Sequence, residues 1–336
     1  MGMRAHKIIL ILLTSLALLI SICFSTPAFA KSKNAFVPRN NMDFSRLESG
    51  QYTVEVLLNG EGPYVFMIDT AATRSSIFEK TLAKLPVQEH SAKEALISGM
   101  TGTRLRPTTT LKSISFGKSI FENHSVIVLE DWDDMLEPLD GILGLEILKK
   151  FAISFSHGNN RLRIRDKFNP RAIKYSGWNK INLISNPYPV EDYGLKFTGA
   201  KIGRNVIPAL IDTGANFTTL SWNSVDGTRL EKEKKRLREQ WVVQGAVGEF
   251  KPRIVVKLDK IIIGGVQLFK HELLLMDFEE LQVNGKGQYP LVIAGVDLMG
   301  GRDFVLDFKN NVVYLEPSDR GWYVGGNASR LLDQYE

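Results

Sequence analysis

Two similar stretches, FMIDTAATRS at residues 66–75 and ALIDTGANFT at residues 209–218, decide the fold. In each, apolar residues lead into an aspartate, which is followed by a threonine and by small residues. An ionisable side chain at the end of an apolar strand is unfavourable unless it has partners or a function. Ala71 and Gly214 leave space beside each aspartate and leave backbone N–H groups able to donate to its carboxylate. Each pattern therefore predicts a buried strand that ends in a polar site.

The two stretches belong to an internal repeat that covers most of the chain, and a repeat of this kind determines how the rest is interpreted. An alternating hairpin pattern precedes each aspartate, and four further features follow each one in the same order. The matching segments are 52–70 with 193–213, ISGMTGT with VQGAVGE, 111–129 with 255–275, GILGLEIL (141–148) with VIAGVDLM (292–299), and 151–164 with 304–315. Each copy predicts about six short strands and one helix, with helix candidates at 76–86 and 227–241.

One such polar site in each copy suggests a pseudo-two-fold axis across which Asp69 and Asp212 meet. Two carboxylates about 3 Å apart cannot both ionise easily, so they share a proton. The ionised member can then take a proton from a water while the protonated member hydrogen-bonds a carbonyl oxygen. Thr70 and Thr213 add hydroxyl groups at the same place. This chemistry requires no metal or cofactor, and we expect neither.

Taken in pairs, FMIDTAAT with GILGLEIL and ALIDTGAN with VIAGVDLM, these segments resemble the aspartic protease superfamily. In that family, an Asp-Thr/Ser-Gly turn in each half is braced by a later apolar-apolar-Gly segment. Each copy looks like a retropepsin-type domain, and the tandem arrangement looks pepsin-like. The resemblance covers roughly residues 48–166 and 188–316. It implies an all-β fold with two pseudo-symmetric retropepsin-like (acid protease) β-barrel lobes and a cleft between them.

The resemblance also implies roles for particular residues. Asp69 and Asp212 would be the catalytic pair, and Thr70 and Thr213 would tie the two active-site turns together, with Ala71 and Gly214 completing those turns. Gly144 and Gly295 would brace the turns from beneath. The flap candidates, which would cover the substrate, are Gly99, Met100, Thr101, Gly102, Gly245 and Gly248.

Two departures from the family pattern leave alternatives open. Ala71 stands where glycine is usual, so a methyl group could crowd the pair. Neither flap candidate carries the tyrosine of pepsin-like enzymes, so Met100 or Thr101 would have to close the site. One alternative is therefore a catalytically weak or inactive peptide-binding module of the same fold. In another, each copy pairs with its counterpart in a second chain.

The first thirty residues have a basic start at Arg4 and Lys7, an apolar run over 8–24, and small residues before Lys31. This pattern predicts a cleaved secretory signal, and an uncleaved membrane anchor is the alternative. Cys23 is the only cysteine, so the mature protein would have no disulfide. We therefore expect export to a bacterial periplasm, the cell surface or the medium. The formal net charge of +5 is small and dispersed, which argues against a nucleic-acid partner.

The predicted organisation divides the chain into six parts. These are a signal peptide (1–30), an N-terminal leader (31–47), a first lobe (48–166), a connector (167–187), a second lobe (188–316) and a C-terminal tail (317–336). Five scattered histidines, His6, His90, His124, His157 and His271, are interpreted as surface or loop residues. The leading hypothesis is a monomeric, exported aspartic endopeptidase that binds an extended peptide between its flaps by backbone pairing.

Overall fold

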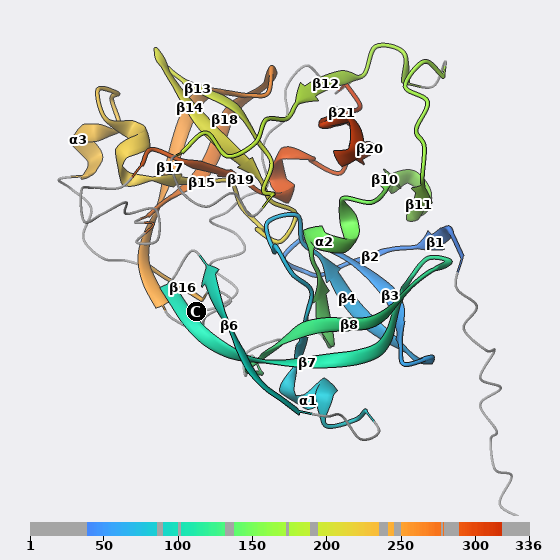
Figure 1. Cartoon of the computed structure of the whole chain (residues 1–336). Coiled ribbons are helices and arrows are strands. Elements are labelled where there is room, and N and C mark those ends of the chain that lie inside the picture. The colour runs from blue at the N-terminus through green and yellow to red at the C-terminus, as the bar shows by residue number, and fades with distance from the viewer. Residues whose placement is uncertain are drawn as a thin grey trace, which may run out of the picture. The chain divides into compact units, whose positions relative to one another are not determined.

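The first barrel is an eight-stranded sheet that closes on itself (Figure 1). The structure is a computed structural model, and it describes residues 39–317 except 86–89, 100–101, 132–137, 173–174, 189–193, 235–240, 245–249, 277 and 279–288. Its order is β2 (Ser45–Arg46), β3 (Tyr52–Leu58), β4 (Glu61–Ile68), β9 (Gly141–Leu143), β5 (Ser76–Phe78), β8 (Ser119–Leu129), β7 (Gly102–Phe116) and β6 (His90–Gly99). An additional pairing of β3 with β7 joins six of these strands in a closed ring. The ring has no free edge, and its interior is filled by apolar side chains.

The second barrel repeats the first, as the duplicated sequence predicts. Its order is β13 (Phe197–Ile202), β14 (Asn205–Ile211), β19 (Val292–Ala294), β15 (Thr219–Ser221), β18 (Val266–Met276), β17 (Phe250–Ile263) and β16 (Trp241–Gln244). A pairing of β13 with β17 closes this ring in the same way that β3 and β7 close the first. In both barrels, the strand that leads into the aspartate pairs in parallel with the strand that leads into the later glycine. The predicted all-β fold with two related barrel lobes is confirmed.

A third sheet joins the two copies. Its order is β1 (Asn41–Asp43), β11 (Arg161–Arg165), β10 (Ala152–Ser156), β20 (Phe304–Asp307), β21 (Val312–Leu315) and β12 (Asn179–Asn182). The antiparallel β10–β20 pair is the junction between the copies. Strands β1 and β12 occupy equivalent positions, each against the last strand of its own copy. The predicted leader and connector therefore each contain a strand that the sequence analysis did not assign.

Helices are short. The described ones are α1 (Glu79–Leu82), α2 (Leu145–Leu148), α3 (Glu231–Lys234), η1 (His157–Asn159), η3 (Trp222–Val225), η5 (Val296–Leu298) and η6 (Phe308–Asn310). The helix expected over 76–86 begins only at Glu79, because Ser76–Phe78 pair with strands β8 and β9 instead. In the helix expected over 227–241, only Glu231–Lys234 is helical among the described residues, and Trp241 begins β16. No helix among the described residues is long and apolar enough to span a membrane.

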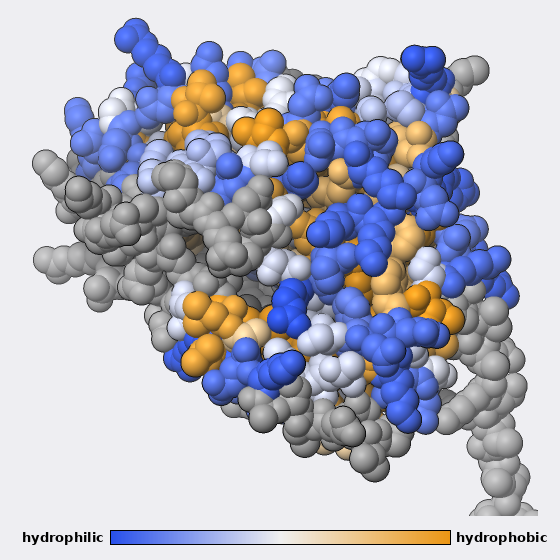
Figure 2. Space-filling model, in the orientation of Figure 1, coloured by the Kyte–Doolittle hydropathy of each residue, from blue (hydrophilic) through white to orange (hydrophobic). Residues whose placement is uncertain are grey.

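The face of the molecule seen in Figure 2 is largely hydrophilic, but hydrophobic residues gather over β6. Leu96 on β6 and Leu105 on β7 lie opposite each other in the ladder, and both are exposed. Their neighbours Ala95 and Ile97 pack on the other side, against an apolar cluster of the first lobe. This hairpin therefore has one face toward the lobe and one face toward solvent, as a flap should.

Candidate active site

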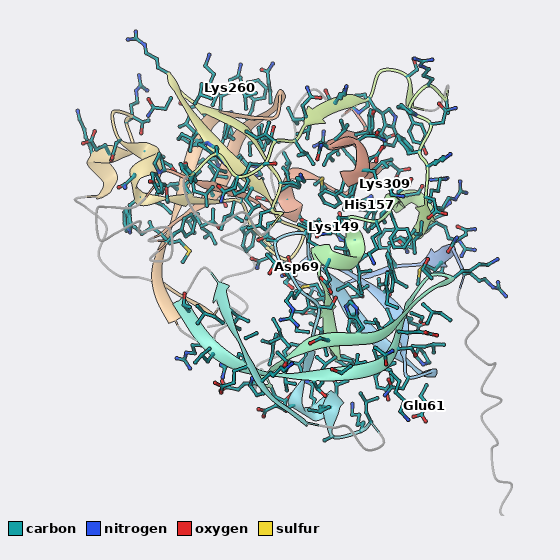
Figure 3. The ribbon with its side chains drawn as sticks, viewed as in Figure 1. Glu61, Asp69, Lys149, His157, Lys260 and Lys309 are labelled. Atoms are coloured by element: carbon teal, nitrogen blue, oxygen red, sulfur yellow. The ribbon has the colours of Figure 1, made fainter. Side chains whose placement is uncertain are left out.

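Asp69 and Asp212 occupy equivalent positions at the ends of two buried strands. Asp69 follows β4, and its N–H donates to the Leu143 carbonyl at 3.1 Å. Asp212 follows β14, and its N–H donates to the Ala294 carbonyl at 2.9 Å. Each parallel strand pair therefore holds the backbone of its aspartate directly, at the centre of its barrel sheet. Figure 3 labels Asp69 close to the short helix α2.

Each carboxylate is held by the turn that follows it. The N–H groups of Ala71 and Ala72 donate to Asp69 Oδ1 at 2.8 and 2.9 Å. The N–H groups of Gly214 and Ala215 donate to Asp212 Oδ1 at 2.8 and 3.1 Å. Small residues permit this geometry because no bulky side chain shields the donors. The matching contacts give the two turns the same local structure.

The two turns are linked across the lobes by a reciprocal set of hydrogen bonds. Thr70 Oγ1 donates to the Ile211 carbonyl, and Thr213 Oγ1 donates to the Ile68 carbonyl, each at 2.7 Å. The same hydroxyl oxygens accept from the opposite turn, with Thr213 N–H donating to Thr70 at 3.1 Å and Thr70 N–H donating to Thr213 at 3.2 Å. Both threonines are buried, so these bonds are shielded from water.

The carboxyl group of Asp69 lies against Gly214, whose N–H donates to Asp212, so the two carboxyl groups of one chain are close enough to interact. Burial raises the pKa of both carboxyl groups. The negative charge of Asp69 raises the pKa of Asp212 further, to well above its usual range, while two backbone N–H donors moderate the rise at each of the two groups. Asp212 is also the more buried of the two. The two groups therefore titrate as a coupled pair that retains one proton more readily than two separate aspartates would.

The unequal third residues of the two turns, Ala71 and Gly214, have a steric explanation. A Cβ atom at Gly214 would lie 2.4 Å from Oδ2 of Asp69, which is far too close. Ala71, in contrast, packs its methyl group against an apolar cluster of the second lobe that includes Leu210 and Ile293. Glycine is therefore required in the second turn, whereas alanine fits in the first.

Gly144 and Gly295, the predicted turn-bracing glycines, each contact the segment that follows one of the turns. The N–H of Gly144 donates to Ser75 Oγ at 2.9 Å, and that of Gly295 donates to Thr218 Oγ1 at 3.2 Å. A Cβ at Gly144 would lie 2.4 Å from the backbone of Arg74, and one at Gly295 would lie 2.7 Å from the backbone of Phe217. Both positions therefore exclude a side chain.

The flap candidates are described only in part. Strands β6 and β7 form a hairpin whose last described pair is Gly99 with Gly102. The intervening Met100 and Thr101 lie outside the described residues, as do Gly245 and Gly248 between β16 and β17. In the second copy, β16 and β17 pair antiparallel at the corresponding place, so each flap candidate adjoins an antiparallel strand pair.

The interpretation of the histidines was wrong for His271 and incomplete for His124. His271 is fully buried, and its Nε2 lies 2.9 Å from Asp297 Oδ2. In the first lobe, His124 Nε2 lies 3.1 Å from Glu146 Oε1. A signal was present in the repeat, because both Gly-Leu-Glu-Ile-Leu and Gly-Val-Asp-Leu-Met carry an acid two residues after the bracing glycine. His157 is half-buried and hydrogen-bonded to Tyr52, while His6 and the side chain of His90 lie outside the described residues.

Within the described ranges, no three His, Cys, Asp or Glu side chains are grouped so that they could hold a metal ion. The titratable groups that the two turns bring together are the carboxyl groups of Asp69 and Asp212. A buried carboxyl pair with one proton can activate a water and polarise a carbonyl group at the same time.

Comparison with known families agrees with this geometry. The family model described as "Aspartyl protease" matches residues 54–147 and 198–298, which together make up more than half of the chain. Each matched segment contains one aspartate of the pair and the glycine that braces it. A comparison with curated proteins finds no match. The chain belongs to the aspartyl protease family, as a tandem of two retropepsin-like domains.

Proposed function

We propose that the protein is an exported aspartic endopeptidase in which Asp69 and Asp212 activate the water that hydrolyses a peptide bond. The observation that carries the proposal is that reciprocal threonine bonds bring the two aspartates together from the two lobes, in a place where burial raises the pKa of both. Family membership supports protease chemistry in general. The assignment of the reaction to these two residues rests on the geometry of the pair.

The unequal surroundings of the two carboxyl groups suggest separate roles. Asp69, the more exposed of the two carboxyl groups, is the ionised base that takes a proton from the water. Asp212, protonated, donates its proton to the carbonyl oxygen as the water oxygen bonds to the carbonyl carbon. As the tetrahedral diol collapses, the ionised Asp212 takes a proton from a diol hydroxyl, the C–N bond breaks, and Asp69 donates the proton it took from water to the leaving nitrogen, which restores the starting state of the pair. The backbone donors on both Oδ1 atoms keep the pair in place throughout.

The proposed substrate is an extended segment of several residues. The β6–β7 hairpin, and β16–β17 in the second copy, can each offer backbone groups to such a segment by strand addition. Alternation in β6 supports this assignment, because Ala95 and Ile97 face the first lobe while Leu96 faces solvent. Export follows from the apolar and basic pattern of the first thirty residues.

Mass-spectrometric mapping of cut sites in a peptide library tests the proposal. The full chain is compared with an Asp69→Asn/Asp212→Asn double variant and with Asp43→Asn, which alters an exposed carboxylate paired to Arg161. We expect cuts by the parent and by Asp43→Asn at the same bonds, and none by the double variant. The library is incubated at acidic and neutral pH, because the shared proton makes the rate depend on pH.

Two results would contradict the proposal in different ways. Equal cutting by the parent and the double variant would mean that other groups, or a contaminating protease, perform the hydrolysis. Peptides bound by the parent but left intact at every pH would instead identify a peptide-binding module built on the same fold.

A further inference from the structure

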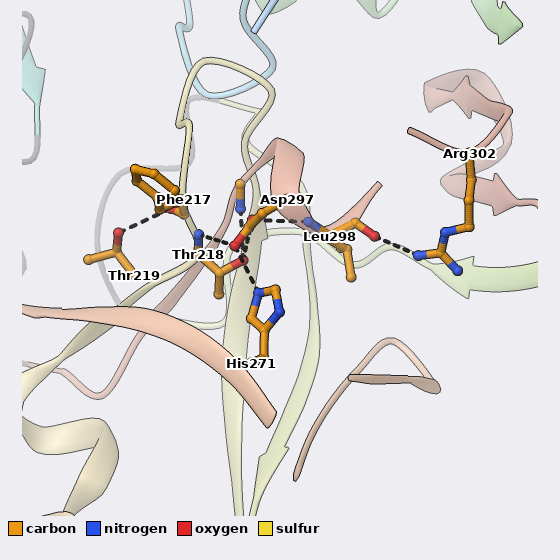
Figure 4. Close-up of polar contacts among 8 residues, drawn as sticks. Phe217, Thr218, Thr219, His271, Asp297, Leu298 and Arg302 are labelled. Atoms are coloured by element: carbon orange, nitrogen blue, oxygen red, sulfur yellow. Dashed lines mark hydrogen bonds and ion pairs between the residues drawn. The ribbon is translucent and has the colours of Figure 1, made fainter. Parts of the chain in front are cut away.

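Behind the catalytic turn of the second lobe lies a buried acid–histidine pair (Figure 4). Thr218 donates to Asp297 through both its N–H, at 2.8 Å, and its hydroxyl, at 2.7 Å. His271 Nε2 lies 2.9 Å from Oδ2 of the same carboxylate. Because an ionised carboxylate only accepts hydrogen bonds, the proton between them belongs to the histidine. Three groups from distant parts of the chain thus converge on one carboxylate.

The first lobe contains the same arrangement. Ser75 N–H donates to Glu146 Oε1 at 2.8 Å, and His124 Nε2 lies 3.1 Å from the same oxygen. Although burial raises the pKa of Glu146, the bonds from His124 and Ser75 outweigh that effect and lower it. Glu146 occupies the position of Asp297, two residues after the bracing glycine. Two acids of different length thus contact residues at equivalent positions in the two copies, although both contacts of Glu146 are made by Oε1 and its Oε2 has no hydrogen-bond partner among the described residues.

These pairs connect to the catalytic carboxylates through the backbone. In the second lobe, Ala215 donates its N–H to Asp212, and its carbonyl accepts from Val296 N–H at 2.9 Å. Val296 immediately precedes Asp297. In the first lobe, the corresponding bond runs from Leu145 N–H to the Ala72 carbonyl at 2.7 Å. The peptide that holds each catalytic carboxylate is therefore fixed by the segment that the acid–histidine pair holds.

The histidines come from barrel strands that also pair with the strand following each catalytic turn. His124 lies on β8 and His271 lies on β18, and each follows a residue with positive φ, Asn123 at 48° and Lys270 at 50°. Both strands thus change conformation immediately before the residue that reaches the acid. The same backbone feature therefore precedes the acid-contacting histidine in both copies.

We infer that His124 with Glu146, and His271 with Asp297, are positioning residues that lock the two catalytic turns to their barrels. A buried carboxylate supplied with several fixed donors makes a rigid anchor, because moving it would leave those donors unsatisfied. The anchor keeps the small-residue turn at the spacing that one shared proton requires. The two anchors differ in accessibility: the side chains of His271 and Asp297 are 0% and 4% exposed, and those of His124 and Glu146 are 18% and 24% exposed.

The test uses His124→Leu, which removes the donor, and His124→Gln, whose amide can still donate to Glu146. His271→Leu and His271→Gln form the matching pair in the second lobe, and His157→Leu is the control for loss of a buried histidine away from both turns. Hydrogen exchange of the full chain is followed in peptides that cover residues 66–75 and 209–218. We expect about tenfold faster exchange in the turn of the altered lobe only, with substantial rescue by glutamine.

Kinetics provide the second readout, and this part rests on the proposed function. Each leucine variant is expected to lower kcat by about 100-fold with little change in KM, because the flaps remain while the carboxyl pair loses its spacing. Glutamine should restore most of the rate, and His157→Leu should leave kcat unchanged.

The exchange experiment stays decisive if the parent cuts no peptide, so failure of the proposed function is distinguishable from failure of the positioning role. Unchanged exchange in the leucine variants, or equal acceleration in both turns and in the control, would overturn the inference. If His271→Leu does not fold, the more exposed His124 pair still provides the comparison.

Discussion

At the scale of single residues, the site depends on a carboxylate that tolerates nothing larger than hydrogen beside it. Gly214 lies against Asp69, whereas Ala71 directs its methyl group into apolar surroundings. The departure from the family pattern at Ala71 is thus local, and it leaves the carboxyl pair intact. The two turns are alike in their hydrogen bonds and unlike in the space beside them.

Gly214→Ala is therefore expected to disable the site, whereas Ala71→Gly is expected to be mild. A methyl group at 214 would displace Asp69 and lower kcat by about 100-fold, and overpacking would reduce stability by about 1–3 kcal/mol. Ala71→Gly removes one methyl contact and should retain most of the activity. Peptide cleavage and thermal unfolding measure both effects. Equal activity of the two variants would show that the site adapts to the extra methyl group.

The residues predicted from sequence and those missed differ in how far their partners lie along the chain. The Asp-Thr-Gly and Asp-Thr-Ala turns were recognisable because their donors follow within three residues. The histidine contacts span 22 residues in one lobe and 26 in the other, so nothing local indicates that His124 or His271 has a partner. Only alignment of the two copies could have shown that each has a histidine and an acid at equivalent positions.

At the scale of elements, long strands were predictable and short ones were not. Tyr52–Leu58 and Val266–Met276 alternate over enough residues to reveal a period of two. Asn41–Asp43 and Asn179–Asn182 are too short for a period, and they are strands only because β11 and β21 offer edges to pair with. Ser76–Phe78 was expected to be helical for a related reason, since pairing with β8 and β9 overrides its local preference.

The element η1 carries a histidine whose surroundings make stability depend on pH. His157 lies against the rings of Phe44, Tyr52 and Phe304, and the Tyr52 hydroxyl lies 3.0 Å from its Nε2. Burial lowers the pKa of His157 to about 4, and the charge of Arg46 adds to this effect against the opposing charge of Asp303. The neutral imidazole is thus the form that fits the fold.

Stability should therefore fall as the pH drops from about 6.5 to about 4, because the unfolded chain binds a proton there that the native chain does not. His157→Gln, which can still hydrogen-bond Tyr52, should remove a loss on the order of 2 kcal/mol, once solvent screening is allowed for. Urea unfolding of parent and variant across this range measures the difference. A constant difference between the two curves would show that His157 does not titrate as described.

At the scale of the whole molecule, the two barrels matter because neither contains a complete site. The β10–β20 pair and the reciprocal Thr70–Thr213 bonds bring the carboxyl groups together, and both connections run between the copies. A single chain thereby brings both carboxyl groups together. In the alternative, in which each copy pairs with its counterpart in a second chain, a partner would have been needed. Bringing the two buried acids together lowers the free energy of unfolding at neutral pH, because the two carboxyl groups must share one proton.

Because the two buried carboxyl groups share one proton, we expect Asp212→Asn to stabilise the protein at neutral pH while abolishing cleavage. The amide oxygen of the introduced asparagine can still accept from Gly214 and Ala215, and its NH₂ group can donate to Asp69. Because the pKa of both acids is raised in the native state, the native parent binds more protons than the unfolded chain above about pH 4, and its stability falls as the pH rises. The variant lacks the Asp212 part of this loss, so its advantage should be absent in acid and reach about 1 kcal/mol or more at neutral pH. Urea unfolding at several pH values measures this advantage, with Asp43→Asn as the control that should show none. An advantage that is equally large in acid would arise from packing rather than from the shared proton.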